Sequence, residues 1–178
     1  KNENYDSKKL NLGSIKIIAS TGSPLAEESF KYVYENIKQD VHLASIAGGT
    51  DLVGCLVLGN LYSNVYKGEI QGQSLGIDVD VFTNNGKSTK DGDKGELVVK
   101  KPFPSMPVKF WGDNDGQKYH KAYFTRFENI WHHGDFIERT SNNGFIMRGR
   151  SDSTLNPGGV RIGTSEIYQQ VEDIDFIT

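Results

Sequence analysis

The sequence of 178 residues contains one cysteine, five prolines and no long hydrophobic run. The single cysteine, Cys55, cannot form a disulfide within the chain, which is typical of a protein from a reducing compartment such as the cytosol. A membrane-spanning helix needs about 20 consecutive apolar residues, and the sequence contains no such run. We also find no signal-peptide pattern at the start of the sequence, so we expect neither secretion nor a membrane partner.

The sequence also lacks a strong excess of either charge. Lysine and arginine total 20 against 23 aspartates and glutamates, which gives a formal net charge of −3. Proteins that bind nucleic acid or anionic membranes generally present a basic surface, so we expect neither of these partners. The 20 glycines indicate many tight turns within a folded domain.

The first part of the chain has the pattern of an α/β unit. Residues 1–13 are mostly polar, and we expect them to form a linker or frayed segment. Within residues 14–65, residues 14–21 predict a buried strand and residues 41–47 predict a second strand parallel to it. Ser23 and Pro24 predict the cap and the first turn of the helix between these strands.

The second part, residues 66–151, has the pattern of antiparallel β-structure. Its short β segments alternate with turns rich in Gly, Asn and Asp, and no helical period separates them. The predicted fold class is therefore α/β, with a parallel β-α-β portion followed by a small antiparallel sheet or barrel. Residues 152–178 form a further segment at the C-terminal end.

The last predicted hairpin brings two charged side chains together. In an antiparallel pair, opposed residues have a constant sum of residue numbers. A loop at Asn142–Asn143 sets Asp135 opposite Arg150, and a loop at Asn143–Gly144 sets it opposite Asp152. A carboxylate can accept hydrogen bonds from two vicinal hydroxyls while arginine donates in a rigid fork, so the pair suits a ribose. The alternative is a surface ion pair worth about 0–1 kcal/mol.

Two turns follow the predicted parallel strands, at the sheet edge where open α/β proteins bind ligands. Thr21–Pro24 links the first strand to the helix, and its alternative reading is a helix cap. In Gly48–Asp51, glycine permits close backbone approach, the Thr50 hydroxyl suits a phosphate and the Asp51 carboxylate suits a divalent cation. The alternative for this second segment is an ordinary turn.

Two other segments carry polar groups with weaker functional signals. Pro157–Arg161 combines flexible backbone with a cation that suits a phosphate, and its alternative is a turn with an exposed arginine. His132 and His133 are adjacent, so in a strand their side chains point to opposite faces, which disfavours a shared metal.

Four segments occur in a characteristic order along the chain: STGSPL, SIAGGTD, WHHGDF and GRSDSTLNPGGVRIGTSEIY. In this order they resemble the adenylate-forming superfamily of acyl-CoA synthetases and luciferases, and within it the acetoacetate–CoA ligase family. The resemblance covers nearly the whole chain after about residue 11, and the last segment is the most specific. It implies the adenylate-forming fold, with residues 14–151 in the large AMP-binding domain and residues 152–178 forming the hinge and the start of the small C-terminal domain.

The resemblance implies a nucleotide site for ATP or AMP. The residues that would lie against the adenine are Gly22, Ser23 and Pro24. Gly49 and Thr50 would line the same site, with Thr50 toward the α-phosphate, and Asp51 would be associated with Mg²⁺. Asp135 would bind the ribose hydroxyls beside Arg150.

Other positions are implied to act on the acid, on CoA and on domain motion. Asp152 would lie at the hinge, so the catalytic candidates are Thr50, Asp51 and Asp152. Gly159 and Arg161 would face the CoA side of the site in the thioester-forming state. Acetyl-CoA synthetases carry a bulky Trp at the position of Gly48. Glycine there would leave room for acetoacetate without requiring it, because shape alone discriminates added carbons by only about 1–3 kcal/mol each.

The activity implied by the resemblance is an ATP-dependent acid–thiol ligase. It would convert acetoacetate, ATP and CoA to acetoacetyl-CoA, AMP and pyrophosphate through an acyl-adenylate. The family's phosphate loop and its catalytic lysine fall before residue 1 and after residue 178, so we expect a fragment that needs the rest of its polypeptide and is inactive alone. The alternatives are a ligase for another short or medium carboxylic acid, and a non-catalytic nucleotide-binding or interaction module.

Overall fold

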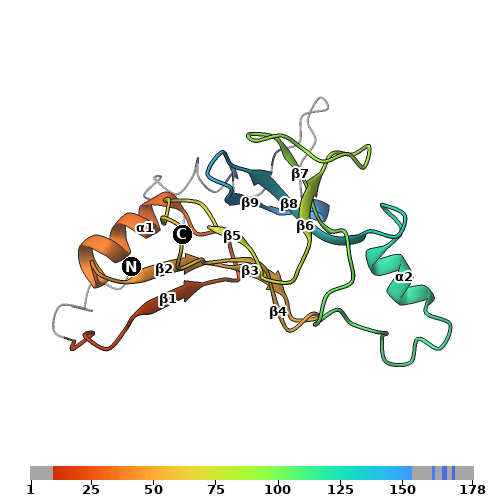
Figure 1. Ribbon diagram of the computed structural model, residues 1–178, viewed down its shortest axis with the longest axis horizontal. Coiled ribbons are helices and arrows are strands. Elements are labelled where there is room, and N and C mark those ends of the chain that lie inside the picture. Colours follow the sequence, from red (N-terminus) through yellow and green to blue (C-terminus); the bar gives the residue numbers. More distant parts are fainter. Residues whose placement is uncertain (1–9, 154–161, 163–165, 168–169, 171–178) are drawn as a thin grey trace.

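The chain folds as three small sheets in succession. In Figure 1, β1 and β2 lie toward one end of the molecule and β6–β9 lie in its upper middle part. The computed structural model describes residues 10–153, 162, 166, 167 and 170. A search of these residues finds no helix that combines the length and the hydrophobicity needed to cross a bilayer.

The first sheet belongs to a β-α-β unit, as the sequence predicts. Strand β1 (Ile17–Ser20) pairs in parallel with β2 (His42–Ser45), and Ile17 lies opposite His42. Helix α1 (Glu27–Tyr32) connects them and continues as the π-helical turn η2 (Val33–Ile37). Phe30 is the buried residue of α1, so it fixes which face of the helix packs inward.

Two details of this unit differ from the sequence prediction. Strand β1 is not buried, because its residues alternate between exposed and half-buried and the Ile17 side chain is 53% exposed. The helix begins after Ala26 without a side-chain cap, so Ser23 does not cap it and Pro24 is not in its first turn. Glu27 and Glu28 in the first turn favour the positive end of the helix dipole instead.

The second sheet is antiparallel and lies in the middle of the chain. It contains β3 (Ala47–Gly49), β4 (Gly54–Leu58) and β5 (Gly72–Gln73), in that order. Gly48 and Gly49 therefore belong to a strand, while Thr50 and Asp51 lie in the turn that follows it. Only the second half of the predicted Gly48–Asp51 turn is a turn.

The third sheet confirms the predicted antiparallel character of the second part. Its strands β6 (Val79–Phe82), β7 (Lys94–Val99), β8 (Trp131–Arg139) and β9 (Phe145–Arg150) follow one another in spatial order. Among the described residues no pairing joins β6 to β9, so the predicted closure into a barrel is not confirmed. The 3₁₀ turn η3 (Ser151–Ser153) follows β9 directly.

A short helix that the sequence pattern does not predict precedes β8. Helix α2 (Gln117–Tyr123) has only seven residues, too few to show a helical period. The carboxylate of Asp113 accepts hydrogen bonds from the backbone N–H groups of Lys118 and Tyr119, which stabilises the start of the helix.

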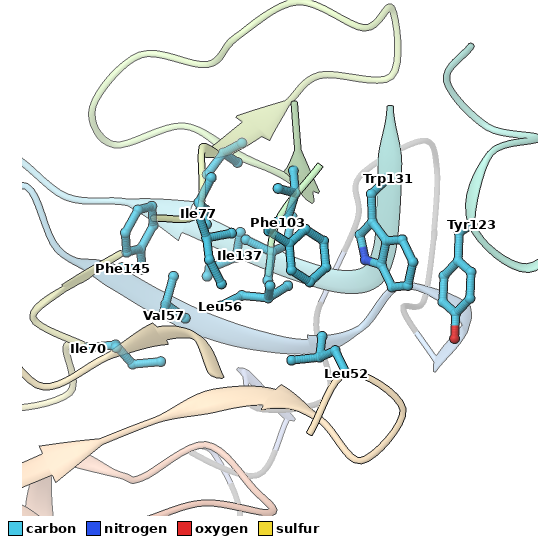
Figure 2. Packing of buried hydrophobic residues seen from close by; sticks show 14 residues of the cluster. Leu52, Leu56, Val57, Ile70, Ile77, Phe103, Tyr123, Trp131, Ile137 and Phe145 are labelled. Carbon is cyan, nitrogen blue, oxygen red and sulfur yellow. The ribbon is translucent and has the colours of Figure 1, made fainter. Parts of the chain in front are cut away.

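The main hydrophobic core lies between the second and third sheets. Leu56 and Val57 of β4 face apolar side chains of β6–β9, and all of them are nearly inaccessible to solvent (Figure 2). Tyr123 of α2 stacks on Trp131 of β8, with ring centroids 3.7 Å apart and planes inclined by 13°. This core fixes the position of β8 relative to β3 and β4, and both borders of the site described below depend on it.

Candidate functional site

A cleft of about 790 Å³ lies where the three sheets meet. It is lined by the loop after β1, by β2–β4 and by the open end of the β8–β9 hairpin. Most of the site residues proposed from the sequence line this one cleft: Gly22, Ser23, Pro24, Gly48, Gly49, Thr50, Asp135 and Arg150. Residues more than a hundred positions apart in the sequence therefore converge on one space.

The Asp135 carboxylate enters the cleft because β8 bulges at this point. Glu96 of β7 pairs with Phe136, whereas Val98 pairs with His132, so β8 places His133, Gly134 and Asp135 opposite a single β7 residue. Bulges of this kind re-aim side chains and are frequent beside binding sites. Gly134 has φ of +85°, and a Cβ at this position would lie 2.6 Å from the Arg150 guanidinium, so glycine lets that side chain cross the bulge.

The hairpin sets Asp135 opposite Arg150, which is the first of the two registers predicted from the sequence. Near the turn, Arg139 lies opposite Phe145, and that register continued without change would place Asp135 opposite Gly149. A second irregularity between Phe136 and Ile137 shifts the pairing by one residue. Arg150 Nη1 then donates to Asp135 Oδ1 at 3.3 Å and to the His133 carbonyl oxygen at 3.1 Å.

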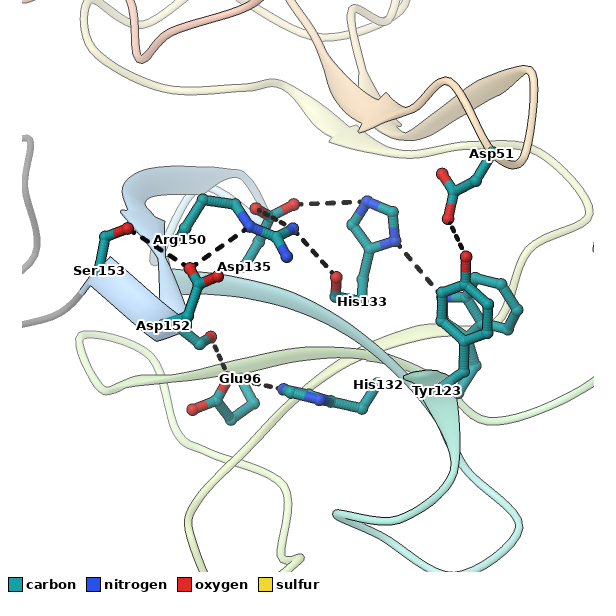
Figure 3. A network of polar contacts seen from close by, with 11 residues as sticks. Asp51, Glu96, Tyr123, His132, His133, Asp135, Arg150, Asp152 and Ser153 are labelled. Carbon is teal, nitrogen blue, oxygen red and sulfur yellow. Dashed lines mark hydrogen bonds and ion pairs between the residues drawn. The ribbon is translucent and has the colours of Figure 1, made fainter. Parts of the chain in front are cut away.

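Asp135 is a carboxylate in a dry position, with 8% of its surface exposed. Burial raises the pKa of Asp135 above the ordinary aspartate value, while the neighbouring His133 and Arg150 limit the rise. The Nε2 of His133 lies 3.5 Å from Asp135 Oδ2 (Figure 3). Each carboxylate oxygen therefore has one neighbouring side chain, Arg150 at Oδ1 and His133 at Oδ2. Both oxygens keep further lone pairs that can accept hydrogen bonds from a ligand.

Asp51 follows Thr50 in the turn after β3 but is not among the residues that line the cleft, and its side chain is held by Tyr123. The Tyr123 hydroxyl donates a hydrogen bond to Asp51 Oδ2 (Figure 3). Burial and the Asp51 carboxylate raise the pKa of the Tyr123 phenol strongly, so the phenol stays protonated and remains a donor. Because Tyr123 also stacks on Trp131, the same aromatic pair anchors the Asp51 side and the β8 bulge.

Gly48 lies at a close approach of two backbones. A Cβ built on Gly48 would lie 2.1 Å from the Gly54 carbonyl oxygen and 2.5 Å from the Cα of Cys55, both in β4. A side chain here would therefore meet the neighbouring strand before it reached the cleft. The close contact between the two strands therefore requires glycine at position 48, independently of the space that an acyl group would need.

The remaining candidate residues lie outside the cleft or outside the described residues. Asp152 is exposed in η3, with Oδ1 at 3.8 Å from Arg150 Nε. Gly159 and Arg161 fall outside the described residues. His132 and His133 have different partners, as expected for neighbours in a strand, because His132 Nε2 donates to Glu96 and His133 faces Asp135.

The sequence does not predict the buried carboxylate of Glu96, which lies on β7 beside the bulge of β8. Glu96 is fully buried and binds Arg126 at 3.1 Å, His132 at 2.9 Å and the Ser151 hydroxyl. Its partners come from the loop after α2, from β8 and from η3. An isolated Glu within an apolar strand is the signal that points to such a cluster, because an unpaired buried charge is costly.

Comparison with known proteins gives relatives of high sequence identity among the acetoacetyl-CoA synthetases. The chain is 60% identical over 166 residues to acetoacetyl-coenzyme A synthetase of Rhizobium meliloti, and 48% identical over 169 residues to acetoacetyl-CoA synthetase of Gallus gallus. The chain is homologous to one segment of the acetoacetyl-CoA synthetases. These matches cover 93% and 94% of the chain but 25% of each relative, so the chain spans about a quarter of the length of acetoacetyl-CoA synthetase. No family model matches the chain.

Solved structures give the same result. Acetoacetyl-CoA synthetase from Streptomyces lividans superposes with a TM-score of 0.84 at 40% identity, over 93% of this chain and 26% of that one. The anthranilate CoA ligase AuaEII in complex with anthranoyl-AMP has a TM-score of 0.77 at 17% identity, over 95% of this chain and 30% of that one, which shows a shared fold alone. The resemblance predicted from the sequence motifs is confirmed, and the fold is that of part of an adenylate-forming enzyme.

Proposed function

We propose that the chain forms the nucleotide-binding segment of an ATP-dependent acetoacetate–CoA ligase. The observation that carries this proposal is the convergence of Thr21–Pro24, Gly48–Thr50, Asp135 and Arg150 on one cleft. The names of the relatives and the order of the motifs favour this activity over a non-catalytic nucleotide-binding module. The single cysteine favours the cytosol as the compartment.

In this proposal each border of the cleft binds a different part of the nucleotide. The loop of Gly22, Ser23 and Pro24 lies against the adenine, and Asp135 accepts hydrogen bonds from the two ribose hydroxyls. Arg150 keeps the carboxylate ionised and oriented from the side of β9. Gly49 brings the backbone close, and the Thr50 hydroxyl donates to the α-phosphate, where negative charge increases during reaction.

Asp51 is the proposed ligand of Mg²⁺. A carboxylate oxygen is the donor that Mg²⁺ prefers, and the ion usually takes one or two carboxylates and completes its coordination with phosphate oxygens and water. Tyr123 occupies Oδ2 of Asp51, and each carboxylate oxygen has two lone pairs, so the chemistry of this donor fits the ion. The bound ion would neutralise phosphate charge.

The reaction that we propose proceeds in two steps. The acetoacetate carboxylate attacks the α-phosphorus of ATP, which forms the acyl-adenylate and releases pyrophosphate. The CoA thiol then attacks the acyl carbon, which forms acetoacetyl-CoA and releases AMP. Asp152 is the proposed hinge between the two steps, Gly159 and Arg161 belong to the CoA side, and the rest of the ligase polypeptide is the proposed partner of this segment.

A chimeric enzyme tests the ligase proposal. Residues 11–150 of this chain would replace the matching segment of the Rhizobium meliloti acetoacetyl-CoA synthetase, to which the chain is 60% identical. We expect acetoacetate-dependent ATP–pyrophosphate exchange at a rate within about tenfold of that enzyme's rate. A misplacement of the reacting groups by about 1 Å would cost ~100-fold in rate, so this result would show that the segment places them correctly. The isolated chain is expected to give no exchange.

Controls in the same chimera separate the alternatives. Asp135→Ala should remove most of the exchange activity, since it removes the proposed ribose ligand. A panel of short and medium carboxylic acids tests the acyl group, and a clear preference for another acid would refute acetoacetate. An inactive chimera together with AMP binding by the isolated chain would favour the non-catalytic module.

Asp135→Ala in the chain itself is expected to weaken AMP binding by about tenfold or more. A hydrogen bond to a charged group contributes about 1.5–3 kcal/mol, and the variant loses the acceptor of two hydroxyls. Isothermal titration calorimetry of AMP into both proteins measures the change. Because the ionised carboxylate is the acceptor, the affinity of the wild type should fall as the pH is lowered through the raised pKa of Asp135.

Two comparisons control this experiment. Asp40→Ala removes an exposed carboxylate paired with Lys38, and its AMP affinity should equal that of the wild type. The Asp135→Ala variant should retain only the pH dependence of the AMP phosphate. Equal affinities of wild type and Asp135→Ala would exclude Asp135 from the site.

A further inference from the structure

The imidazole of His133 is fixed between a donor on one side and an acceptor on the other. Trp131 Nε1–H donates to His133 Nδ1 at 3.4 Å, so Nδ1 carries the lone pair. The ring proton is then on Nε2, which lies 3.5 Å from Asp135 Oδ2 (Figure 3). Because Trp131 donates to Nδ1, the Nε2 atom of His133 carries the proton and presents a donor to the Asp135 carboxylate.

The surroundings of His133 allow it little freedom. Its side chain is 4% exposed, and its ring is inclined by 21° to that of Trp131 at a centroid distance of 6.5 Å. On the cleft side, a Cβ on Gly49 would lie 2.9 Å from His133 Cε1. The ring is thus held between Trp131 and the backbone of β3, within the bulge that also carries Asp135.

We propose that His133 is a positioning residue that orients the Asp135 carboxylate for the ribose hydroxyls. This inference rests on the proposed nucleotide site. His133 Nε2 faces Oδ2 at 3.5 Å while Arg150 Nη1–H donates to Oδ1, so the two groups orient the carboxylate before the ligand arrives. Arg150 alone is a weaker guide because its side chain is 53% exposed, whereas the histidine is enclosed and anchored to the core through Trp131.

Two substitutions of similar size separate the donor from the bulk of the ring. His133→Gln keeps an N–H donor near the position of Nε2, and His133→Leu fills the space without a donor. We expect His133→Leu to weaken AMP binding by about tenfold, and His133→Gln to remain within about threefold of the wild type. Calorimetry with AMP and with 2′,3′-dideoxy-AMP measures both effects, and the dideoxy nucleotide should bind wild type and His133→Leu equally.

The dideoxy nucleotide distinguishes positioning from general damage to the fold. A merely structural role would weaken both nucleotides alike, and that result would overturn the inference. Equal AMP affinities of wild type and His133→Leu, with Asp135→Ala still weakened, would overturn it as well. If wild type and Asp135→Ala bind AMP alike, the proposed function fails instead.

A measurement on the wild-type chain tests the inference without a variant or a ligand. Long-range ¹H–¹⁵N NMR spectra report which imidazole nitrogen carries the proton. We expect His133 to be the Nε2–H tautomer, and Trp131→Phe to release this preference. A proton on Nδ1 of the neutral ring in the wild type would overturn the inference, because Nε2 would then offer Asp135 no donor.

Discussion

Gly48→Ala is expected to destabilise the chain by about 3 kcal/mol, although it adds only one methyl group. The new Cβ would lie 2.1 Å from the Gly54 carbonyl oxygen, and both atoms belong to paired strands whose backbones cannot move apart without loss of hydrogen bonds. Urea denaturation followed by circular dichroism measures the change. At this chain length, such a loss corresponds to a fall in Tm of about 6–12 °C.

Gly72→Ala is the matched control for this experiment. Gly72 lies in β5 of the same sheet, and nothing would lie within 4 Å of a Cβ at that position. The substitution should leave the stability close to that of the wild type. If Gly48→Ala were as well tolerated as Gly72→Ala, β3 and β4 would have to be further apart than the structure places them.

The close contact of Gly48 with β4 also affects which acyl groups the site can accept. Because a side chain at position 48 would meet β4 first, a larger residue there requires a different course of β3 or β4. Substrate preference at this position therefore depends on the backbone as well as on the volume of one side chain. The acid panel with the chimera tests selectivity with the backbone of this chain in place.

The opposition of Asp135 and Arg150 could be predicted from the sequence, but the path to it could not. Counting from the turn suffices to find candidate partners, because antiparallel pairing conserves the sum of residue numbers. The observed hairpin begins in a different register and reaches the predicted pair only after a shift at Phe136. Bulges depend on contacts with β7 and on packing across the sheet, which a single sequence does not reveal.

The start of α1 illustrates the opposite case, in which local signals were misleading. Ser23 and Pro24 have the residue types of a helix start, yet both lie before the helix, in the loop that lines the cleft. The predicted burial of β1 also failed, since among the described residues only β2 pairs with it and Ile17 remains largely exposed. Position within a fold overrides such preferences, because each is worth only about 1 kcal/mol.

His133 and Glu96 were not predicted as parts of the site because their partners are distant in the sequence or depend on the bulge. The adjacent histidines contact different carboxylates, His132 that of Glu96 and His133 that of Asp135. Their roles follow only from the β7–β8 register, which turns the two rings to opposite sides. Tyr123 likewise reaches Asp51 from a helix that has no periodic signal.

Glu96→Ala is expected to destabilise the chain by about 3 kcal/mol, at the lower end of the range for breaking a buried charged cluster. The substitution removes the carboxylate that Arg126 and His132 share and that accepts a hydrogen bond from the Ser151 hydroxyl. Arg126 keeps 37% of its side chain exposed and can regain water, which limits the loss. The unfolding free energy from urea denaturation measures the effect.

Glu96→Gln and Asp78→Ala complete this test. Glutamine keeps the shape and one acceptor oxygen, so its effect should lie between those of wild type and Glu96→Ala. Asp78 pairs with Lys100 and Lys101 at the surface, where solvent screens the charges, and its loss should change stability far less. Because Ser151 begins the turn that carries Asp152, the loss of Glu96 should also speed amide hydrogen exchange at residues 151–153. Unchanged stability and exchange in Glu96→Ala would mean that water replaces the carboxylate in full, and that Glu96 does not hold this turn.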